Sequence, residues 1–232
     1  METDISFYVA EDNLAVRAVI FDYGMVLSNA QEPAAYTKLL EITGLPRDTF
    51  EPHYWRYRLD YDQGTLNGRS YWARLGQDAG ILLTPEQIES LIENDVLMWA
   101  TVNEQMLAWV EALQKAGVPT AILSNMGEDL LRYMRQEFAW LAAFDHHTWS
   151  CEVGLIKPDP AIYTWTCEKI GVPPQEALFL DDRAENVEAA KTVGLYAIQF
   201  RNVDQLRVEL ESTGLLNGLP LPDPEPTVRN SR

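Results

Sequence analysis

Short apolar runs alternate with longer amphipathic segments along most of this chain. Residues 16–22 (VRAVIFD) form a β-branched apolar run with a turn signal after it, which is typical of a buried strand. The pattern recurs three times, and the segment 144–150 (FDHHTWS) is a weaker fifth candidate. The three recurrences are residues 119–125, 176–182 and 195–200.

Helical patterns lie between these predicted strands. Apolar positions at helical spacing predict helices over residues 103–117, 128–141, 159–171 and 184–194. Three of them end on a glycine, where a left-handed cap is needed: Gly117, Gly171 and Gly194. Strands that alternate with helices predict an α/β fold, a doubly wound parallel sheet with helices on both faces.

One long segment breaks the alternation. Residues 31–102 contain aromatic and helical patterns and no strand pattern, so we expect an inserted α-helical segment after the first strand. The sheet and its covering helices then comprise residues 1–30 and 103–216. Residues 217–232 contain four prolines, and we predict that this tail is disordered.

Composition and charge restrict the possible partners. The chain has 232 residues, 47% of them hydrophobic, and a formal net charge of −17, which argues against nucleic acid and anionic membranes as partners. The two cysteines match neither a zinc site nor a disulfide framework. The acidic N-terminus does not resemble a signal peptide, and no apolar run approaches the roughly 20 residues of a membrane span. We expect a cytoplasmic monomer or homodimer that acts on a small molecule.

Polar side chains stand at the ends of several predicted strands, and a lysine follows another. In a doubly wound sheet, ligands bind beyond the carboxyl ends of the strands, so these segments should converge on one crevice. They would bring together carboxylates, a hydroxyl, an amide and an ammonium group. The residues are Asp22, Ser124, Asn125, Lys157, Asp181 and Asp182.

Several of these residues also have a purely structural interpretation. Asn125 and Asp182 each precede a glutamate by three residues, which is the spacing of a helix capping box. Lys157 could be a solvated loop residue. Asp22 is harder to explain in this way, because an aspartate directly after an Ile-Phe run is a poor strand former and costly to bury unpaired.

Four motifs in this order resemble the haloacid dehalogenase-like hydrolases. They are FDYGMVLS, ILSN, the lysine of GLIKPDPAIY, and LFLDDRAENVEAA, and the resemblance covers about residues 15–215. It implies a Rossmann-like core and the helical cap of the family's first subclass. The nearest look-alikes are sugar-phosphate phosphatases and the phosphatase domain attached to some epoxide hydrolases.

The resemblance implies a chemistry for these residues. Asp22 would attack phosphorus and form an aspartyl phosphate. Mg²⁺ would be the cofactor, bound by the Asp22 carboxylate, the Gly24 carbonyl and the Asp182 carboxylate, because it is a hard ion that prefers oxygen ligands. Lys157 would neutralise charge, and Ser124 would donate a hydrogen bond to a phosphoryl oxygen.

Three further residues would assist this site. By the same resemblance, Asn125 would contact the phosphate or the substrate. Asp181 and Asn186 would orient Lys157 or metal-bound water from behind the reacting groups. The expected activity is a Mg²⁺-dependent phosphatase that hydrolyses a small phosphate ester.

Gly24 departs from the family pattern. The usual phosphatase of this family has a second aspartate there, which acts as general acid and then as base. Such a group is typically worth on the order of 10²–10⁴ in rate. Tyr23 is a poor substitute, because strand alternation points it away from Asp22. Either the leaving group needs little help, or the proton comes from water or from a cap residue such as His53, Asp60 or Asp62.

Two alternative functions remain open. A 2-haloacid dehalogenase uses the same nucleophile without metal and also lacks the second aspartate, although the Asp181-Asp182 pair would repel its acid substrate. A catalytically weak binding or regulatory protein on the same fold is the other. Substrate choice should lie in the cap, where Arg56, Arg58 and the nearby aspartates could line the cleft. Of the three aromatic residues Tyr54, Trp55 and Trp72, most are expected in the cap's own core.

Overall fold

A five-stranded parallel sheet forms the centre of the computed structural model, which describes residues 16–216 and 218–224. In chain order its strands are β1 (Ala18–Phe21), β2 (Thr120–Ser124), β3 (His146–Trp149), β4 (Ala177–Asp181) and β5 (Tyr196–Gln199). They lie side by side in the order β3-β2-β1-β4-β5. The predicted α/β class with a parallel sheet is confirmed, and the weak candidate at 144–150 contains a true strand.

Helices cover both faces of this sheet. The core helices are α6 (Glu104–Lys115), α7 (Glu128–Glu137), α8 (Ser150–Val153), α9 (Pro160–Ile170), α10 (Ala184–Thr192) and α11 (Val203–Thr213). The predicted helix over 128–141 ends early, at Glu137, and a 3₁₀ turn over Ala139–Ala143 replaces its last part.

Among the described helices, none combines the length and apolar character needed to cross a bilayer.

The central strand β1 shows why both faces are covered. Its side chains alternate between two hydrophobic layers, as the period of a strand requires. Val19 and Phe21 pack in the layer that contains apolar side chains of α6, α7 and α11. Ala18 and Ile20 pack in the opposite layer, with α9 and α10. A strand buried on both faces reads as a continuous apolar run, which explains the pattern before Asp22.

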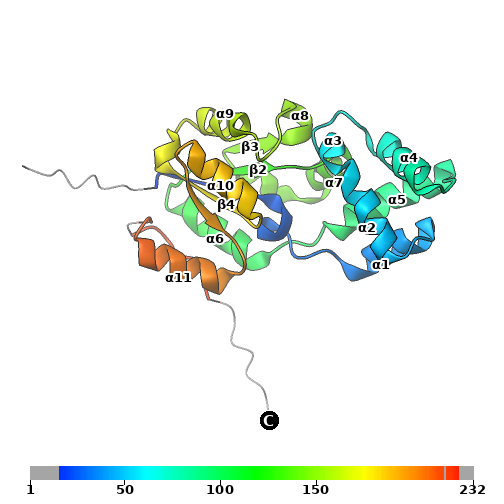
Figure 1. Ribbon diagram of the computed structural model, residues 1–232. Coiled ribbons are helices and arrows are strands. Elements are labelled where there is room, and N and C mark those ends of the chain that lie inside the picture. The colour runs from blue at the N-terminus through cyan, green and yellow to red at the C-terminus, as the bar shows by residue number, and fades with distance from the viewer. Residues whose placement is uncertain (1–15, 217, 225–232) are drawn as a thin grey trace, which may run out of the picture.

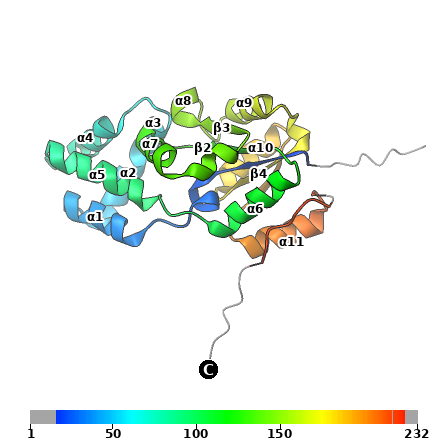
Figure 2. The ribbon, with the colours of Figure 1, turned by 180° about the vertical axis from the view of Figure 1, so that it is seen from behind.

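Five helices follow β1 and lie to one side of the sheet (Figures 1 and 2). They enclose a separate core that is rich in aromatic side chains, including Phe50, Tyr54, Tyr71 and Trp72. The described part of 31–102 contains no strand of the sheet. These helices are α1 (Pro33–Thr43), α2 (Arg47–Arg56), α3 (Arg58–Asp62), α4 (Gly68–Ala79) and α5 (Pro85–Met98). We refer to residues 31–102 as the cap.

The two connections between the cap and the sheet run antiparallel to each other. Ser28 and Val102 form an isolated antiparallel bridge. The backbone N–H of Asn29 donates to the carbonyl of Thr101 at 2.9 Å. A side-chain bond from Asn29 to the Val102 carbonyl, at 2.8 Å, adds to this pairing. Entry and exit of the cap are therefore joined at one hinge beside the end of β1.

The first part of the proline-rich tail packs against the core. The indole N–H of Trp109 donates to the carbonyl of Pro220 at 2.7 Å, and Arg207 donates to the carbonyl of Pro222 at 2.7 Å. Residues 218–224 are therefore held by α6 and α11, and the prediction of disorder does not hold for them. Residues 217 and 225–232 of the tail, and residues 1–15 of the core, lie outside the described residues.

Candidate active site

The ends of β1 and β4 bring three carboxylates together. The two strands pair in parallel from Ala18 with Ala177 to Phe21 with Leu180. Asp22 therefore follows β1 next to the end of β4, where Asp181 and Asp182 stand. One carboxylate oxygen of each of these three residues lies within 4.8 Å of the others. The convergence expected of a doubly wound sheet is present.

Lys157 enters this cluster from the loop before α9. Its Nζ lies 2.8 Å from Asp22 Oδ1 and 2.6 Å from Asp181 Oδ2, and it also donates to the carbonyl of Leu123 at 3.1 Å. The residue is 2% exposed. A lysine this deeply buried is seldom tolerated without such partners, so it is not the solvated loop residue of the alternative interpretation.

Two amide side chains hold Lys157 and its partner Asp181 in place. Asn125 binds the backbone of Lys157 at both ends, because its amide N–H donates to the carbonyl and its oxygen accepts from the backbone N–H, each at 2.9 Å. Asn186 donates to both oxygens of Asp181 at 3.0 Å. Asn125 is thus engaged with the lysine loop, and one amide hydrogen remains for the substrate contact predicted from sequence.

The capping-box interpretation fails for both of its candidates. The N-cap residue of α7 is Gly127, two positions after Asn125. The N-cap residue of α10 is Arg183, one position after Asp182. Neither cap has a side-chain hydrogen bond, so neither candidate satisfies a helix terminus.

The cluster carries more negative than positive charge. Burial raises the pKa of Asp22 to about 7, with Lys157 opposing the rise and Asp181 adding to it. Burial and the charge of Asp181 likewise raise the pKa of Asp182. For Asp181, Lys157 and the hydrogen bonds from its neighbours outweigh burial and lower the pKa. Burial alone would lower the pKa of Lys157, but Asp181 and Asp22 raise it.

This donor set fits a hard divalent cation. Three carboxylates and one ammonium group leave the cluster with a net charge of −2 when all are ionised. Carboxylate oxygens at this spacing are the ligands that Mg²⁺ prefers. Gly24 lines the same cavity as Asp22 and Asp182, as its predicted role as a carbonyl ligand requires.

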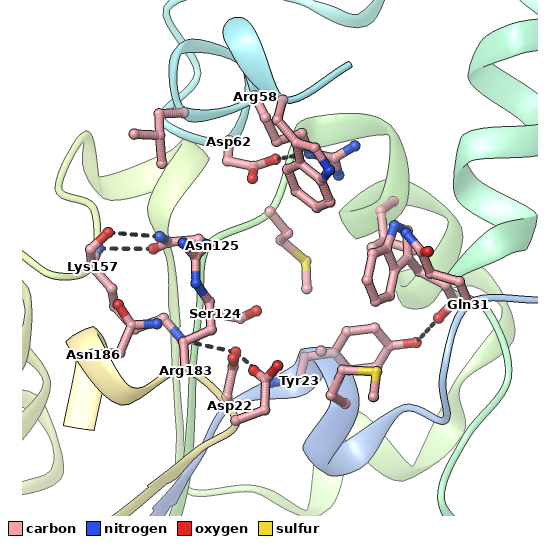
Figure 3. A pocket seen from close by; sticks show the side chains of 18 of the residues that line it. Asp22, Tyr23, Gln31, Arg58, Asp62, Ser124, Asn125, Lys157, Arg183 and Asn186 are labelled. Carbon is pink, nitrogen blue, oxygen red and sulfur yellow. Dashed lines mark hydrogen bonds and ion pairs between the residues drawn. The ribbon is translucent and has the colours of Figure 1, made fainter. Parts of the chain in front are cut away.

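Ser124 stands at the last position of β2, 2% exposed, and lines the cavity. Its hydroxyl has no hydrogen-bond partner among the described residues, and Figure 3 shows it between Asn125 and Asp22. A hydroxyl in that position can donate to a bound anion, as the sequence predicted.

The turn after Asp22 has an unusual backbone. Gly24 has φ −58° and ψ 128°, which any residue can adopt, and a Cβ there would meet no atom within 4 Å. The strained residue is Met25, whose φ of 61° lies in the left-handed region. Tyr23 donates its hydroxyl to the carbonyl of Trp99 at 2.7 Å, and burial raises its pKa, so it is a poor proton donor.

A cavity of about 800 Å³ lies between the carboxylate cluster and the cap. Figure 3 shows Arg58 and Asp62 of the cap on the side opposite Asp22. Of the sequence candidates, the cavity contains Asp22, Gly24, Arg58, Asp62, Ser124, Asn125, Lys157, Asp182 and Asn186. Asp181 lies behind it, fully buried.

The cap residues divide differently from the prediction. His53, Arg56 and Asp60 do not line the cavity. Tyr54 and Trp72 are buried, as expected for most of the three aromatic residues, whereas Trp55 lines the cavity and is 49% exposed. Sequence reasoning also missed several apolar and polar lining residues, because they come from separate elements and meet only in the folded molecule. The missed residues are Met25, Ala30, Gln31, Leu59, Trp99, Met126, Leu130 and Arg183.

Arg58 and Asp62 belong to a buried charged network inside the cap. Arg58 Nε donates to Asp62 at 2.9 Å, and Nη1 donates to both oxygens of Asp95, at 3.0 and 2.9 Å. The Tyr54 hydroxyl donates to Asp95 at 2.6 Å. Burial raises the pKa of Asp62 to about 6, with Arg58 opposing the rise and Asp95 adding to it.

The sequence matches the family of haloacid dehalogenase-like hydrolases over residues 16–194. This match covers most of the chain and includes all four motifs, among them the two that carry Asp22, Asp181 and Asp182. The protein belongs to this family.

Curated proteins with different activities are similar to the chain. Bifunctional epoxide hydrolase 2 of Mus musculus is 29% identical over 219 residues, covering 85% of this chain and 39% of the mouse protein. The chain thus spans about two-fifths of the epoxide hydrolases that it matches. (S)-2-haloacid dehalogenase 1 of Pseudomonas sp. (strain CBS-3) is 27% identical over 209 residues, covering 82% of this chain and 86% of the dehalogenase.

A solved structure has the same fold. The haloacid dehalogenase family enzyme of Bacteroides thetaiotaomicron, in complex with magnesium and inorganic phosphate, matches with a TM-score of 0.68 and 17% identity. The match covers 81% of this chain and 95% of that protein.

Proposed function

We propose that this hydrolase is a Mg²⁺-dependent phosphatase that acts on a small phosphorylated metabolite through an aspartyl phosphate on Asp22. The observation that carries the proposal is the surplus negative charge of the cluster: three carboxylates within 4.8 Å share one ammonium group. A cation fits between such a cluster and an anionic substrate. The Bacteroides relative with magnesium and phosphate is consistent with this.

The residues would divide the work as follows. Asp22 would attack phosphorus, while Lys157 and Ser124 would stabilise the charge on the phosphoryl oxygens. Asp181 and Asn186 would hold Lys157 in place. Mg²⁺, held by Asp22, Asp182 and the carbonyl of Gly24, would supply electrostatic stabilisation of the phosphoryl group.

The surroundings of the site also belong to the proposal. Residues 1–30 and 103–216 would act as the catalytic core and residues 31–102 as a cap that selects the substrate. With a net charge of −17, the protein would have neither nucleic acid nor membrane as partner. A cytoplasmic monomer or homodimer fits these features.

A haloacid dehalogenase is the second candidate, because the Pseudomonas relative has that activity and Gly24 supplies no acid. The charged side chains that line the cavity argue against a dehalogenase. A haloacid carboxylate would need an uncommitted cation, whereas the cations lining the cavity are paired: Lys157 with Asp22, Arg58 with Asp62 and Arg183 with Glu185. A dehalogenase works without metal and would also have no use for the Asp182 carboxylate, whereas Asp181 could still hold Lys157.

One experiment tests both candidates. Hydrolysis of p-nitrophenyl phosphate with Mg²⁺ and with a chelator should show metal-dependent turnover, and chloride release from 2-chloropropionate should be absent. Asp22→Asn should keep the fold, monitored by near-ultraviolet circular dichroism, and lose turnover. More than trace phosphatase activity in that variant would rule out the covalent mechanism. Absence of both activities in the natural protein would favour a binding or regulatory role.

A further inference from the structure

The cavity has two chemically different parts. Its floor contains the carboxylate cluster with Lys157 and Ser124, where the phosphoryl group of a substrate would bind. The rest of its wall is largely apolar and comes from both the core and the cap. The apolar lining residues are Met25, Ala30, Trp55, Leu59, Trp99, Met126 and Leu130.

Three of these apolar residues are unusually exposed. Met25 is 38% exposed, Trp55 49% and Leu59 54%, and they are among seven large hydrophobic residues exposed in the described part of the chain. Met25 follows β1, Trp55 belongs to α2 and Leu59 to α3, so the core and the cap both contribute. Exposed apolar side chains that gather at one cavity indicate a surface that another apolar group covers.

Met25 is also held in a strained conformation. Its φ of 61° is one that glycine adopts freely and a long side chain does not. Its backbone N–H donates to the hydroxyl of Ser28 at 3.0 Å, which helps to fix the turn. Strain of this kind is typically found at functional sites. A methionine thioether is flexible and polarisable, so it adapts to apolar ligands of different shape.

The polar groups of the wall are mostly occupied. Tyr23 donates to a backbone carbonyl, Arg58 is bound by two carboxylates, and Asn186 donates to Asp181. Gln31 and the buried indole N–H of Trp99 have no such partner among the described residues. A sugar would need a hydrogen-bond partner for each buried hydroxyl, because an unpaired hydroxyl is costly to bury. The wall offers few such partners and much apolar surface.

We infer that the substrates are phosphate monoesters with an apolar body, which Met25, Trp55 and Leu59 clamp while the phosphate lies at Asp22. This inference rests on the proposed phosphatase function. It means that Met25, Trp55 and Leu59, which we call the apolar rim, contact the substrate itself. The competing explanation is that the cap closes and buries the rim against itself, without substrate contact.

Straight-chain alkylphosphonates test the inference, because they cannot be hydrolysed and differ only in apolar length. Their inhibition constants against p-nitrophenyl phosphate hydrolysis, from methyl to octyl, should fall roughly three- to fourfold per buried methylene until the cavity is filled. A hexose 6-phosphate should inhibit weakly. If the protein hydrolyses no phosphate ester, calorimetric titration of the Mg²⁺-loaded protein with the same series tests binding separately from the proposed function.

Variants distinguish substrate contact from closure of the cap. Trp55→Ala and Met25→Gly should weaken inhibition by long alkylphosphonates most and by methylphosphonate least, because each removes a wall that only the chain touches. Leu82→Ala is the matched control, since Leu82 is fully exposed and does not line the cavity. Inhibition that does not depend on chain length would overturn the inference. So would an equal loss for every chain length in Trp55→Ala, which would assign the rim to cap closure.

Discussion

At the scale of single residues, Gly24 matters for the chemistry of the site and not for the conformation of the backbone. Its φ and ψ are accessible to any residue, and a Cβ would meet open space. Conformation therefore does not explain why a glycine stands there, and its chemical effect is the absence of a carboxylate beside Asp22. In the proposed phosphatase reaction, the departing oxygen of a substrate would then carry its own negative charge or receive a proton from elsewhere. Of the three cap candidates, only Asp62 lines the cavity.

The first prediction concerns this missing acid. In single-turnover experiments with aryl phosphates, the rate of Asp22 phosphorylation should rise steeply as the pKa of the leaving phenol falls. Gly24→Asp should flatten that dependence and speed up the poorest leaving groups most, by up to about 10²–10⁴. The open space around Gly24 makes the substitution sterically acceptable.

A shallow dependence in the natural protein would contradict this interpretation and point to Asp62. In that case Asp62→Asn should make the dependence steep, because it removes a carboxyl group that faces the cavity. Asp60→Asn is the control, since Asp60 lies two positions away and does not line the cavity.

The second prediction follows from the pKa of Asp22. Burial raises that pKa to about 7 when no cation is present, so a proton competes with Mg²⁺ for the carboxylate below neutral pH. The affinity for Mg²⁺ should therefore weaken as the pH falls from about 7 to 6 and should level off above about 8. Calorimetry in two buffers of different ionisation enthalpy should detect proton release near pH 6.5. An affinity independent of pH between 6 and 8 would contradict the combination of a raised pKa at Asp22 with metal binding by its carboxylate.

At the scale of elements, the cap depends on a buried charged network that spans three helices. Arg58 on α3 binds Asp62 on the same helix and Asp95 on α5, and Tyr54 on α2 binds Asp95. Both carboxylates are buried, with 6% and 3% exposure. One cation serves two carboxylates, so its removal would leave both uncompensated.

The third prediction is that Arg58→Met destabilises the protein by about 3–5 kcal/mol, the typical cost of breaking a buried ion pair by removing one partner. Urea unfolding monitored by tryptophan fluorescence measures this. Arg56→Met is the matched control, because Arg56 pairs with Asp78 at the surface and should change stability little. Equal effects of the two substitutions would mean that the network contributes nothing beyond surface charge.

The sequence predicts elements well where one periodicity dominates. The strand that leads to Asp22 is apolar throughout, so its pattern is clear. The edge strand β3 reads HHTW, with two partly exposed histidines, so its signal is weak. In the cap, Tyr54 and Trp55 are neighbours of similar chemistry, yet one is buried and the other faces the cavity. Only the packing of α2 on its neighbours decides between them, and a local pattern does not contain that information.

At the scale of the whole molecule, the site lies between the sheet and the cap. The order of the strands determines the sheet side of the site, and the packing of helices determines the cap side. The catalytic side could be predicted because parallel strands bring their carboxyl ends to one edge, so the order of strands and helices along the chain already places Asp22, Ser124 and Asp182 together. The cap side could not, because it depends on how helices pack across the hinge at Ser28 and Val102. The apolar rim therefore arises only in the folded molecule.

The last prediction concerns the gain in stability on addition of Mg²⁺ and separates specific binding from screening of the protein's net charge. A net charge of −17 means that any divalent cation should stabilise the fold slightly by screening. Specific binding at the cluster adds about 2.7 kcal/mol when Mg²⁺ is present at 100 times its dissociation constant. For a chain of this size that should raise Tm by about 5 °C or more.

Asp182→Asn should separate the two effects. Burial and Asp181 raise the pKa of Asp182, so its charge is unfavourable without metal and the variant should be more stable than the natural protein in a chelator. Addition of Mg²⁺ should then reverse the order, because only the natural protein gains specific stabilisation. Glu185→Gln removes one nearby charge outside the cluster and should keep the full Mg²⁺ shift. If Asp182→Asn kept that shift, the response would be screening alone, and the cluster would not be a metal site.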